Sequence, residues 1–390
     1  MNGPDPVWGQ TSFYPLEPAP EPLLCWLWLA GTLGAGSSHN GSVLDTFGDA
    51  QEAWEQRGTD AFRRAAGVPA AQRAVQPDNT PEHYRAFAQR CEKRGIQILT
   101  YDDPDYPLAF SRIPDMPLVL YCTGDPHWLN APGAVGMVGS RKPTDYGLRA
   151  AASIGSGLAR NGAVIVSGLA DGLDSAGHRA AVQEHAPTIA VMGVPIDKTY
   201  PVSNRVLRRQ IEENGCVISE YPPESETPKK FSFLQRNRLI AALSNALVVV
   251  EAREKSGTMS TVAHAERYGK PVFAVPGNID SPGSVGTNGL LRDGRAKAVC
   301  RAEDLFEALN LHPPVQNSAK PAASSISRPA PAPLSEVERK ILACVGPAAK
   351  GMEELGMESG LPLPLLSSTL MKLELAGRVT CLPGKRYILR

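Results

Sequence analysis

Two apolar runs of the sequence are followed by glycine-containing segments of a kind that binds phosphate. Gly139-Ser140-Arg141 comes directly after the run ending at Val138, and a longer segment, 167–174, follows Val166. Glycines let backbone N–H groups approach an anion, and the helix that follows adds its positive N-terminal dipole. The longer segment contributes Ser167, Gly168, Ala170, Gly172 and Asp174. Together the two segments predict a site for more than one phosphate, whereas glycine packing and helix capping by Asp174 are the structural alternatives.

A third segment, 229–238, combines positive charge with aromatic rings. It carries four cations and two phenylalanines, Phe231 and Phe233, and no acidic residue. Cations that follow a phosphate backbone and rings that stack on bases are the parts of a single-strand-binding site, where each stacked base contributes about 1–3 kcal/mol. The alternative is that the rings belong to the core and the cations to a solvated rim. Ser256-Gly257-Thr258 is either a further anion-binding helix start or a helix cap.

Composition argues against several classes of protein. Forty Lys and Arg residues balance 40 Asp and Glu residues, so a polyanion must be bound by local groups rather than by bulk charge. The seven cysteines form no CxxC, which favours reduced thiols in the cytoplasm over disulfides or zinc. The apolar stretch 23–33 is shorter than the roughly 20 residues that cross a bilayer, so we expect no membrane contact.

Several enzyme motifs are missing from the sequence. It has no P-loop, no His-Glu-x-x-His, no Gly-x-Ser-x-Gly and no dinucleotide fingerprint after Val138. ATPase and dehydrogenase activities therefore lose support, and we expect no cofactor and no metal.

Strands and helices alternate from 95 to 311. Runs of this kind predict an α/β domain with an extended Rossmann-like parallel sheet covered by helices on both faces. In such a sheet ligands bind just outside the carboxyl ends of the strands, which is where the phosphate-binding segments should lie. The expected strands are 96–100, 118–122, 135–138, 164–166, 189–192, 217–219, 247–250 and 272–275.

The N-terminal third has a different pattern. Residues 1–22 are rich in proline and predict a mobile lead, and 23–94 predict a small helical domain. Its expected helices are 24–29, 41–54 and 61–66. The glycine turns at 34–36 and 67–69 are either phosphate-gripping turns of the helix-hairpin-helix type or, as we favour, plain connections between helices.

The C-terminal part follows a linker. Residues 312–333 are rich in Pro, Ser and Ala, and 334–390 predict three helices and a two-stranded wing, the pattern of a winged helix. The helix expected at 364–376 contains Lys372 as its one cation, a poor basic face for reading duplex DNA. The unit is therefore predicted to contact protein, or to bind duplex DNA weakly.

The order and spacing of these motifs resemble those of the DNA processing protein A (DprA/Smf) family. The resemblance covers roughly 102–309, and one departure is Leu234-Gln235 after Phe233, where the family commonly has Phe-Pro before Arg-Asn-Arg. The motifs that carry it are Met137-Val138-Gly139-Ser140-Arg141, the segment 167–174, Tyr200-Pro201 with Asn204, Ser219-Glu220, Arg236-Asn237-Arg238, Glu251 with Ser256-Gly257-Thr258, and Pro276-Gly277.

The resemblance implies a protein that binds single-stranded DNA, forms a homodimer and loads RecA recombinase during natural transformation, and that is not an enzyme. It also implies a sterile-alpha-motif-like N-terminal domain and a winged helix. By this resemblance Arg141 holds phosphate, and Lys230 and Phe233 contact bases. The residues implied in or beside the DNA site are Gly139, Ser140, Arg141, Ser167, Gly168, Ala170, Gly172, Asp174, Lys230, Phe233, Arg236, Asn237, Arg238, Ser256, Gly257 and Thr258.

One enzymatic alternative remains open at this point. Similar sheets with Ser-Gly-Thr and Pro-Gly turns occur in nucleotide phosphoribohydrolases. The candidate acid or nucleophile would then be Asp171, Asp174, Glu220 or Glu251.

Overall fold

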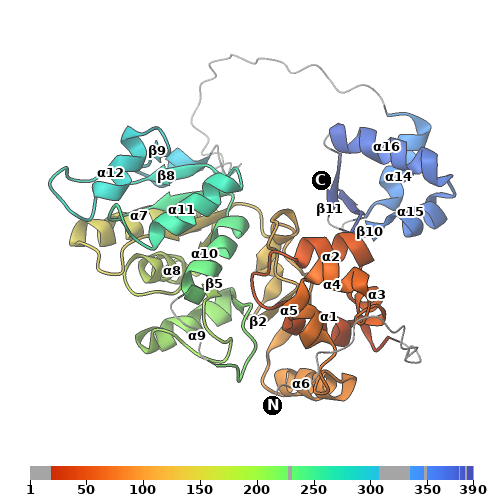
Figure 1. Ribbon diagram of the computed structural model, residues 1–390. Coiled ribbons are helices and arrows are strands. Elements are labelled where there is room, and N and C mark those ends of the chain that lie inside the picture. Colours follow the sequence, from red (N-terminus) through yellow and green to blue (C-terminus); the bar gives the residue numbers. More distant parts are fainter. Residues whose placement is uncertain are drawn as a thin grey trace.

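The computed structural model describes residues 19–226, 231–306, 334–346, 349–376, 378–382 and 384–389. An N-terminal group of helices, a large α/β part and a small C-terminal unit follow one another along the chain (Figure 1). The predicted mobile lead and the predicted linker 312–333 lie wholly or mostly outside the described residues. None of the described helices is both long and apolar enough to span a membrane. All seven cysteines lie within the described residues, as free thiols.

A nine-stranded sheet forms the centre of the α/β part, in the order β1-β2-β6-β5-β4-β3-β7-β8-β9. Within this order the strands β6, β5, β4, β3, β7, β8 and β9 each pair parallel with their neighbours among them, as the alternation of strands and helices predicts. The strands β1 and β2 pair antiparallel with each other, and β2 pairs antiparallel with β6, so this edge differs from the all-parallel expectation. The strands are β1 (Gln97–Thr100), β2 (Val119–Gly124), β3 (Ala134–Val138), β4 (Val164–Ser167), β5 (Thr188–Met192), β6 (Cys216–Ser219), β7 (Ala246–Val249), β8 (Val272–Ala274) and β9 (Lys297–Ala298).

Both faces of the sheet are covered, which explains the uniformly apolar strands. In β3, Val135 and Met137 belong to one buried cluster and Ala134 and Val138 to another, because successive side chains point to opposite faces. The first cluster includes α7 and α8, and the second includes α10 and α11. The helices of this part are α7 (Asp145–Arg160), α8 (Leu173–Gln183), α9 (Arg205–Asn214), α10 (Phe231–Leu243), α11 (Thr258–Arg267) and α12 (Val285–Arg292).

The N-terminal helices share the second cluster with the sheet. Trp26 packs against Tyr101 with ring centroids 5.8 Å apart, and Asn40 Nδ2 donates to the carbonyl of Met116 at 2.7 Å. The single helix expected at 41–54 is two helices, because Gly48 at φ +81° ends the first. The helices are α1 (Pro22–Leu33), α2 (Asn40–Phe47), α3 (Ala50–Glu55), α4 (Asp60–Ala66), α5 (Val68–Ala74) and α6 (Pro81–Lys93).

The C-terminal unit has the helices and wing of a winged helix. Its sheet has three strands rather than two, since β10 pairs with β12, and β12 with β11. Its elements are α14 (Glu336–Cys344), β10 (Lys350–Gly351), α15 (Met352–Ser359), α16 (Leu363–Leu375), β11 (Val379–Leu382) and β12 (Arg386–Leu389).

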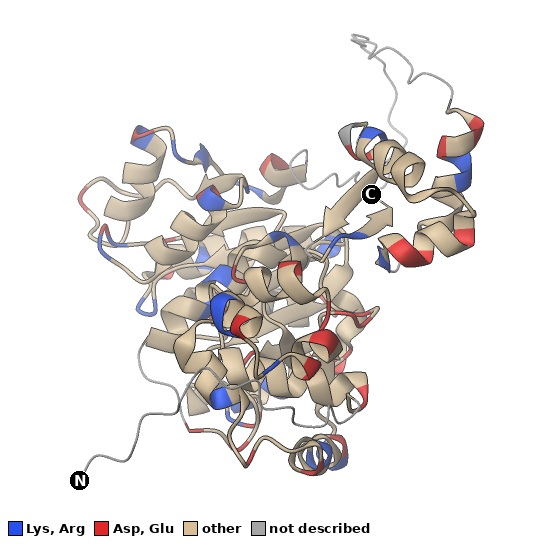
Figure 2. Ribbon diagram, turned by 45° about the vertical axis from the view of Figure 1, so that its right-hand side comes forward, with Lys and Arg blue, Asp and Glu red and all other residues tan. Residues whose placement is uncertain are grey.

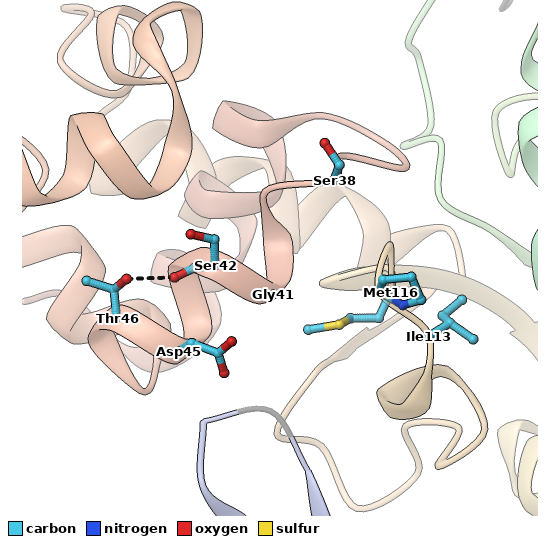
Figure 3. Close-up of a pocket in the computed structure, with 8 residues that line it drawn as sticks. Ser38, Gly41, Ser42, Asp45, Thr46, Ile113 and Met116 are labelled. Atoms are coloured by element: carbon cyan, nitrogen blue, oxygen red, sulfur yellow. Dashed lines mark hydrogen bonds between the residues drawn. The ribbon is translucent and has the colours of Figure 1, made fainter.

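The wing of this unit lies against the N-terminal helices. A Cβ placed at Gly384, in the wing, would lie 2.9 Å from the carbonyl oxygen of Gly48 at the end of α2. An open cavity of about 500 Å³ lies between α2 and the segment with Ile113 and Met116 (Figure 3). Lys, Arg, Asp and Glu are interspersed over all three parts, in keeping with the balanced composition (Figure 2).

Candidate nucleic-acid interface

The two glycine segments meet at the carboxyl edge of the neighbouring strands β3 and β4. Leu173 N donates to the carbonyl of Ser140 at 3.1 Å, so the start of α8 is bonded to the loop after β3. Gly172 has φ +83°, and a Cβ there would collide with the Ser140 carbonyl oxygen. A glycine is therefore required for this close approach, as the motif predicted. Ser167 is buried, and its hydroxyl donates to the carbonyl of Met137 at 2.6 Å, inside the sheet.

Asp174 stabilises the segment 167–174 from the buried side. Its carboxylate is buried and accepts from Gly168 N at 3.2 Å. Burial raises the pKa of this carboxyl, and nearby Arg236 opposes that rise. The side chain thus stabilises the turn, and it does not cap α8, which begins at Leu173 without a side-chain cap.

Arg236 fastens α10 to the ends of two strands. It is 4% exposed, and its Nη1 donates to the carbonyl of Gly168 at 2.9 Å and to that of Val191. Burial lowers the pKa of this guanidinium to about 10. A Cβ at Gly168 would collide with the guanidinium, so that glycine makes room for it. Arg236 therefore lies beneath the interface and positions it.

Arg238 is also turned away from solvent. It is 1% exposed and forms ion pairs with Glu220 at 2.6 Å and with Asp115 at 3.4 Å. Because α10 buries this side chain, Arg238 anchors the helix and does not present a charge to DNA. Between the two arginines, Asn237 Nδ2 donates to the carbonyl of Gly257 at 3.2 Å and ties α10 to the loop before α11.

Exposed cationic and aromatic side chains lie around Phe233. The guanidinium carbon of Arg141 lies 5.7 Å from the centre of the Phe233 ring, and the Tyr200 ring centre lies 5.1 Å from it. Arg141 is exposed, Tyr200 is 47% exposed, and Phe233 is half-buried against Gly193. Phe231, at the start of α10, is 70% exposed. We call Arg141, Tyr200 and Phe233 the aromatic cluster.

Tyr200 and Lys142 belong to this surface, but they are not among the DNA-site residues that the family resemblance implies. Tyr200 follows β5 and precedes a proline, and Lys142 is exposed next to Arg141. An aromatic residue in a loop after a parallel strand was the available signal for Tyr200. Lys230 lies outside the described residues.

The segment 256–258 completes the edge beside β3. The helix α11 begins at Thr258, and the Thr258 hydroxyl donates to the carbonyl of Gly139 at 3.2 Å. The Ser256 hydroxyl is buried and has no hydrogen-bond partner among the described residues. The N-terminus of α11 therefore lies next to the Gly139-Ser140-Arg141 loop, where an anion would meet its dipole.

The acids considered for catalysis are mostly occupied by protein groups. Glu251 is 2% exposed and accepts from Thr144 N at 2.9 Å and from the Thr144 hydroxyl. Glu220 is paired with Arg238 and also accepts from Gly36 N at 3.2 Å. The Gly36 amide is therefore engaged within the protein, so the turn at 34–36 connects helices and does not offer this amide to phosphate. Asp171 is exposed and accepts from the Ser203 hydroxyl at 3.1 Å.

The fold and this edge define a Rossmann-like protein whose strand edge carries exposed cations and aromatic rings, joined to a winged helix. Residues 97–310 match the family model described as DNA recombination-mediator protein A, and 325–385 match the DprA winged helix domain. The chain belongs to the DNA recombination-mediator protein A family, which confirms the resemblance to DprA/Smf proteins.

Proteins of similar sequence carry the names Smf and DprA. Protein Smf of Synechocystis is 33% identical over 329 residues, covering 77% of this chain and 82% of its own. DNA processing protein DprA of Bacillus subtilis is 38% identical over 217 residues, covering 56% and 72%.

Two solved structures resemble the fold. DprA of Streptococcus pneumoniae matches with a TM-score of 0.64 and 31% identity, covering 74% of this chain and 99% of that one. DNA processing protein A of Helicobacter pylori, whose structure describes a single-stranded DNA binding mode, matches with a TM-score of 0.51 and 36% identity, covering 56% and 97%.

Proposed function

We propose that this protein binds single-stranded DNA without sequence preference at the carboxyl edge of β3, β4 and β5. The observation that carries the proposal is the aromatic cluster, in which an exposed cation lies beside two rings. A guanidinium pairs with phosphate, and an aromatic ring stacks on the face of any base. Because these contacts do not distinguish one base from another, we expect binding without sequence preference.

The surroundings of the cluster support polymer binding. The Thr258 hydroxyl bonds the Gly139 carbonyl, so the N-terminus of α11 lies beside the loop after β3, and Lys142 adds an exposed charge. A chain with no net charge can meet a polyanion in this way, through a small number of local groups. Lys230, which precedes Phe233 in the order Lys230-Phe231-Ser232-Phe233, is proposed as a base contact on the family resemblance.

The wider role proposed here rests on family membership. The protein would protect incoming DNA, act as a homodimer in the cytoplasm and load RecA recombinase during natural transformation. In this scheme 95–311 is the DNA-binding domain, 23–94 the helical domain, and 312–333 a tether for the winged helix 334–390. Two copies of the edge on one dimer would hold a longer strand by avidity.

The protein is proposed to act by binding rather than by catalysis. Asp174, Glu220 and Glu251 are each held by protein hydrogen bonds or an ion pair, which favours a positioning role over an acid or nucleophile.

One experiment separates binding from catalysis. Purified protein is titrated with a fluorescent oligothymidylate over a range of salt, and in parallel incubated with nucleoside monophosphates. Binding that weakens with salt, together with no release of free base, supports the proposal. Turnover of a monophosphate, or no binding of the oligonucleotide at low salt, contradicts it.

A further inference from the structure

A second cavity lies at the same sheet edge but outside the aromatic cluster. Its volume is about 500 Å³, and it is formed at the ends of β3, β7 and β8. Its polar lining comes from Thr144, Glu251, Asn278, Ser281 and Ser284. The strand order reverses here, since β4 and β7 flank β3, and ligands of open α/β sheets bind where the order reverses. Arg141, Tyr200 and Phe233 are not among its lining residues.

Ser284 contributes a hydroxyl to the lining of this cavity. The residue is 2% exposed and lines the cavity, and its backbone carbonyl accepts from the Thr287 hydroxyl at 3.1 Å. Gly277 lies directly against the Ser284 hydroxyl, because a Cβ at Gly277 would collide with the Ser284 Oγ. A serine hydroxyl can both donate and accept hydrogen bonds, so this group is suited to bond a molecule in the cavity.

Glu251 sets the charge of the cavity. Its carboxylate lines the space while its two oxygens accept from Thr144, and each oxygen retains capacity for a second hydrogen bond. Within the part of the chain that the structure describes, the lining contains no Lys, Arg or His. A carboxylate accepts hydrogen bonds and repels phosphate, so the cavity favours an uncharged ligand that donates through hydroxyl groups.

A flat wall completes the cavity. Tyr146 is 43% exposed, and its hydroxyl donates to the carbonyl of Pro276 at 2.7 Å, which fixes the ring at the cavity's side. An aromatic ring held in this way offers its face to another planar ring. The cavity thus combines hydroxyl-binding groups with a planar surface, in a volume within the range of small-molecule sites.

We propose that this cavity binds an uncharged nucleoside, with the sugar hydroxyls on Glu251 and Ser284 and the base against Tyr146. The inference goes beyond single-stranded DNA binding and does not depend on it, because no member of the aromatic cluster takes part. Charge separates the two sites: the DNA edge has an exposed arginine, and the nucleoside cavity has a buried carboxylate.

The test uses the full chain and isothermal titration calorimetry with adenosine, guanosine and adenosine 5′-monophosphate. We expect saturable binding of at least one nucleoside, and weaker binding of the monophosphate than of adenosine. Ser284→Ala should weaken the nucleoside about five-fold, the loss expected for one hydrogen bond. Ser281→Trp, which fills the half-buried rim of the cavity, should abolish the signal. Arg141→Ala should leave nucleoside binding unchanged.

Three outcomes would overturn the proposal. They are no heat from either nucleoside at millimolar concentration, binding that neither Ser284→Ala nor Ser281→Trp affects, and tighter binding of the monophosphate than of adenosine. Oligothymidylate binding is measured on the same preparations. An active DNA binder that ignores nucleosides refutes this cavity alone, whereas a folded protein that ignores DNA refutes the proposed function.

Discussion

Arg141 is the exposed cation of the aromatic cluster, and its removal tests the DNA edge directly. We predict that Arg141→Ala weakens oligothymidylate binding by about 1.5–3 kcal/mol, the range for a hydrogen bond to a charged group. The slope of log affinity against log salt should become shallower by about 0.7, because one phosphate contact is lost. Fluorescence anisotropy at several salt concentrations measures both quantities.

Arg160→Ala is the matched control for this variant. Arg160 ends α7, whose 16 residues place it about 24 Å from the helix start beside the DNA edge. Its surface pair with Glu184 contributes at most about 1 kcal/mol to stability. Equal loss of DNA binding in the two variants would show that bulk charge, and not the edge, binds the strand.

Phe233 tests base stacking. Phe233→Leu keeps an apolar side chain against Gly193 but removes the ring, so we predict a loss of about 1–3 kcal/mol in DNA affinity with little change in stability. Tyr200→Leu should act in the same direction because its ring packs on that of Phe233. An affinity equal to that of the unsubstituted protein in both variants would exclude stacking at this cluster.

His178 predicts a dependence of stability on pH. The residue is buried, its ring bonds the Thr188 hydroxyl at 2.7 Å, and burial lowers its pKa to about 3. Between about pH 6.5, the ordinary pKa of histidine, and that value, the unfolded chain takes up a proton that the folded chain does not. The free energy of unfolding should therefore fall as pH falls through this window, by up to about 1.4 kcal/mol per pH unit.

Urea unfolding of His178→Gln at pH 7 and pH 5 measures this contribution. The variant should lose less stability between the two pH values than the unsubstituted protein does. The same substitution at His185, an exposed residue just past the end of α8, is the matched control. If His178→Gln and His185→Gln behave alike, burial of His178 does not set the pH dependence.

At the scale of residues, the sequence identifies which segments carry candidate side chains, but it does not predict which of these side chains are exposed and which are buried. The cations of 229–238 are alike in sequence, yet Arg236 and Arg238 are buried whereas the exposed cation Arg141 comes from another loop. Arg238 pairs with Glu220, on the far side of a loop, and with Asp115, and Arg236 donates to carbonyls at the ends of two strands. Only the strand order brings these groups together, and local sequence pattern does not determine that order.

At the scale of elements, α10 links the N-terminal helices to the proposed DNA-binding edge of β3, β4 and β5. Gln235 Nε2 donates to the carbonyl of Ala35 at 2.5 Å, and Glu220 joins Gly36 to Arg238. The same helix carries Phe233. The position of the aromatic cluster therefore depends on contacts with the loop between α1 and α2.

Glu220→Gln tests this anchor. It leaves the Arg238 guanidinium buried with a weakened ion pair, so we predict a loss of about 3 kcal/mol or more in the free energy of unfolding. Glu184→Gln, which breaks the surface pair with Arg160, should cost less than about 1 kcal/mol. Chemical denaturation measures both, and similar small losses would contradict the buried anchor.

Elements were more predictable than connections between them. The strands and the helices of the winged helix follow from period and punctuation, because apolar runs bounded by glycine or proline fix their own length. The antiparallel edge of β1 and β2 was not predictable, since both strands have the same apolar pattern as the parallel ones.

At the scale of the whole molecule, the winged helix lies against the N-terminal helices through its wing. On α16 the exposed side chains include Leu363, Leu365 and Met371, and Lys372 is its single cation. We predict that a chain ending before 334 binds oligothymidylate as tightly as the full chain does. Its affinity for duplex DNA should be no higher than that of the full chain. Fluorescence anisotropy with labelled oligothymidylate and with labelled duplex measures both affinities. A large loss of single-strand affinity would place the winged helix in the DNA path.

The shared core of the N-terminal helices and the sheet has a consequence for synthesis on the ribosome. Helices α1 to α6 emerge first, but the strand that covers β2 on its open side is β6, whose residues Cys216–Ser219 are made only after β3, β4 and β5. Until then the nascent chain exposes an unpaired strand edge and half of an apolar core, the state in which chains aggregate. We therefore expect fragments that end before β6 to require chaperones, and fragments that end between β6 and α10 still to lack the part of this core that α10 and α11 supply.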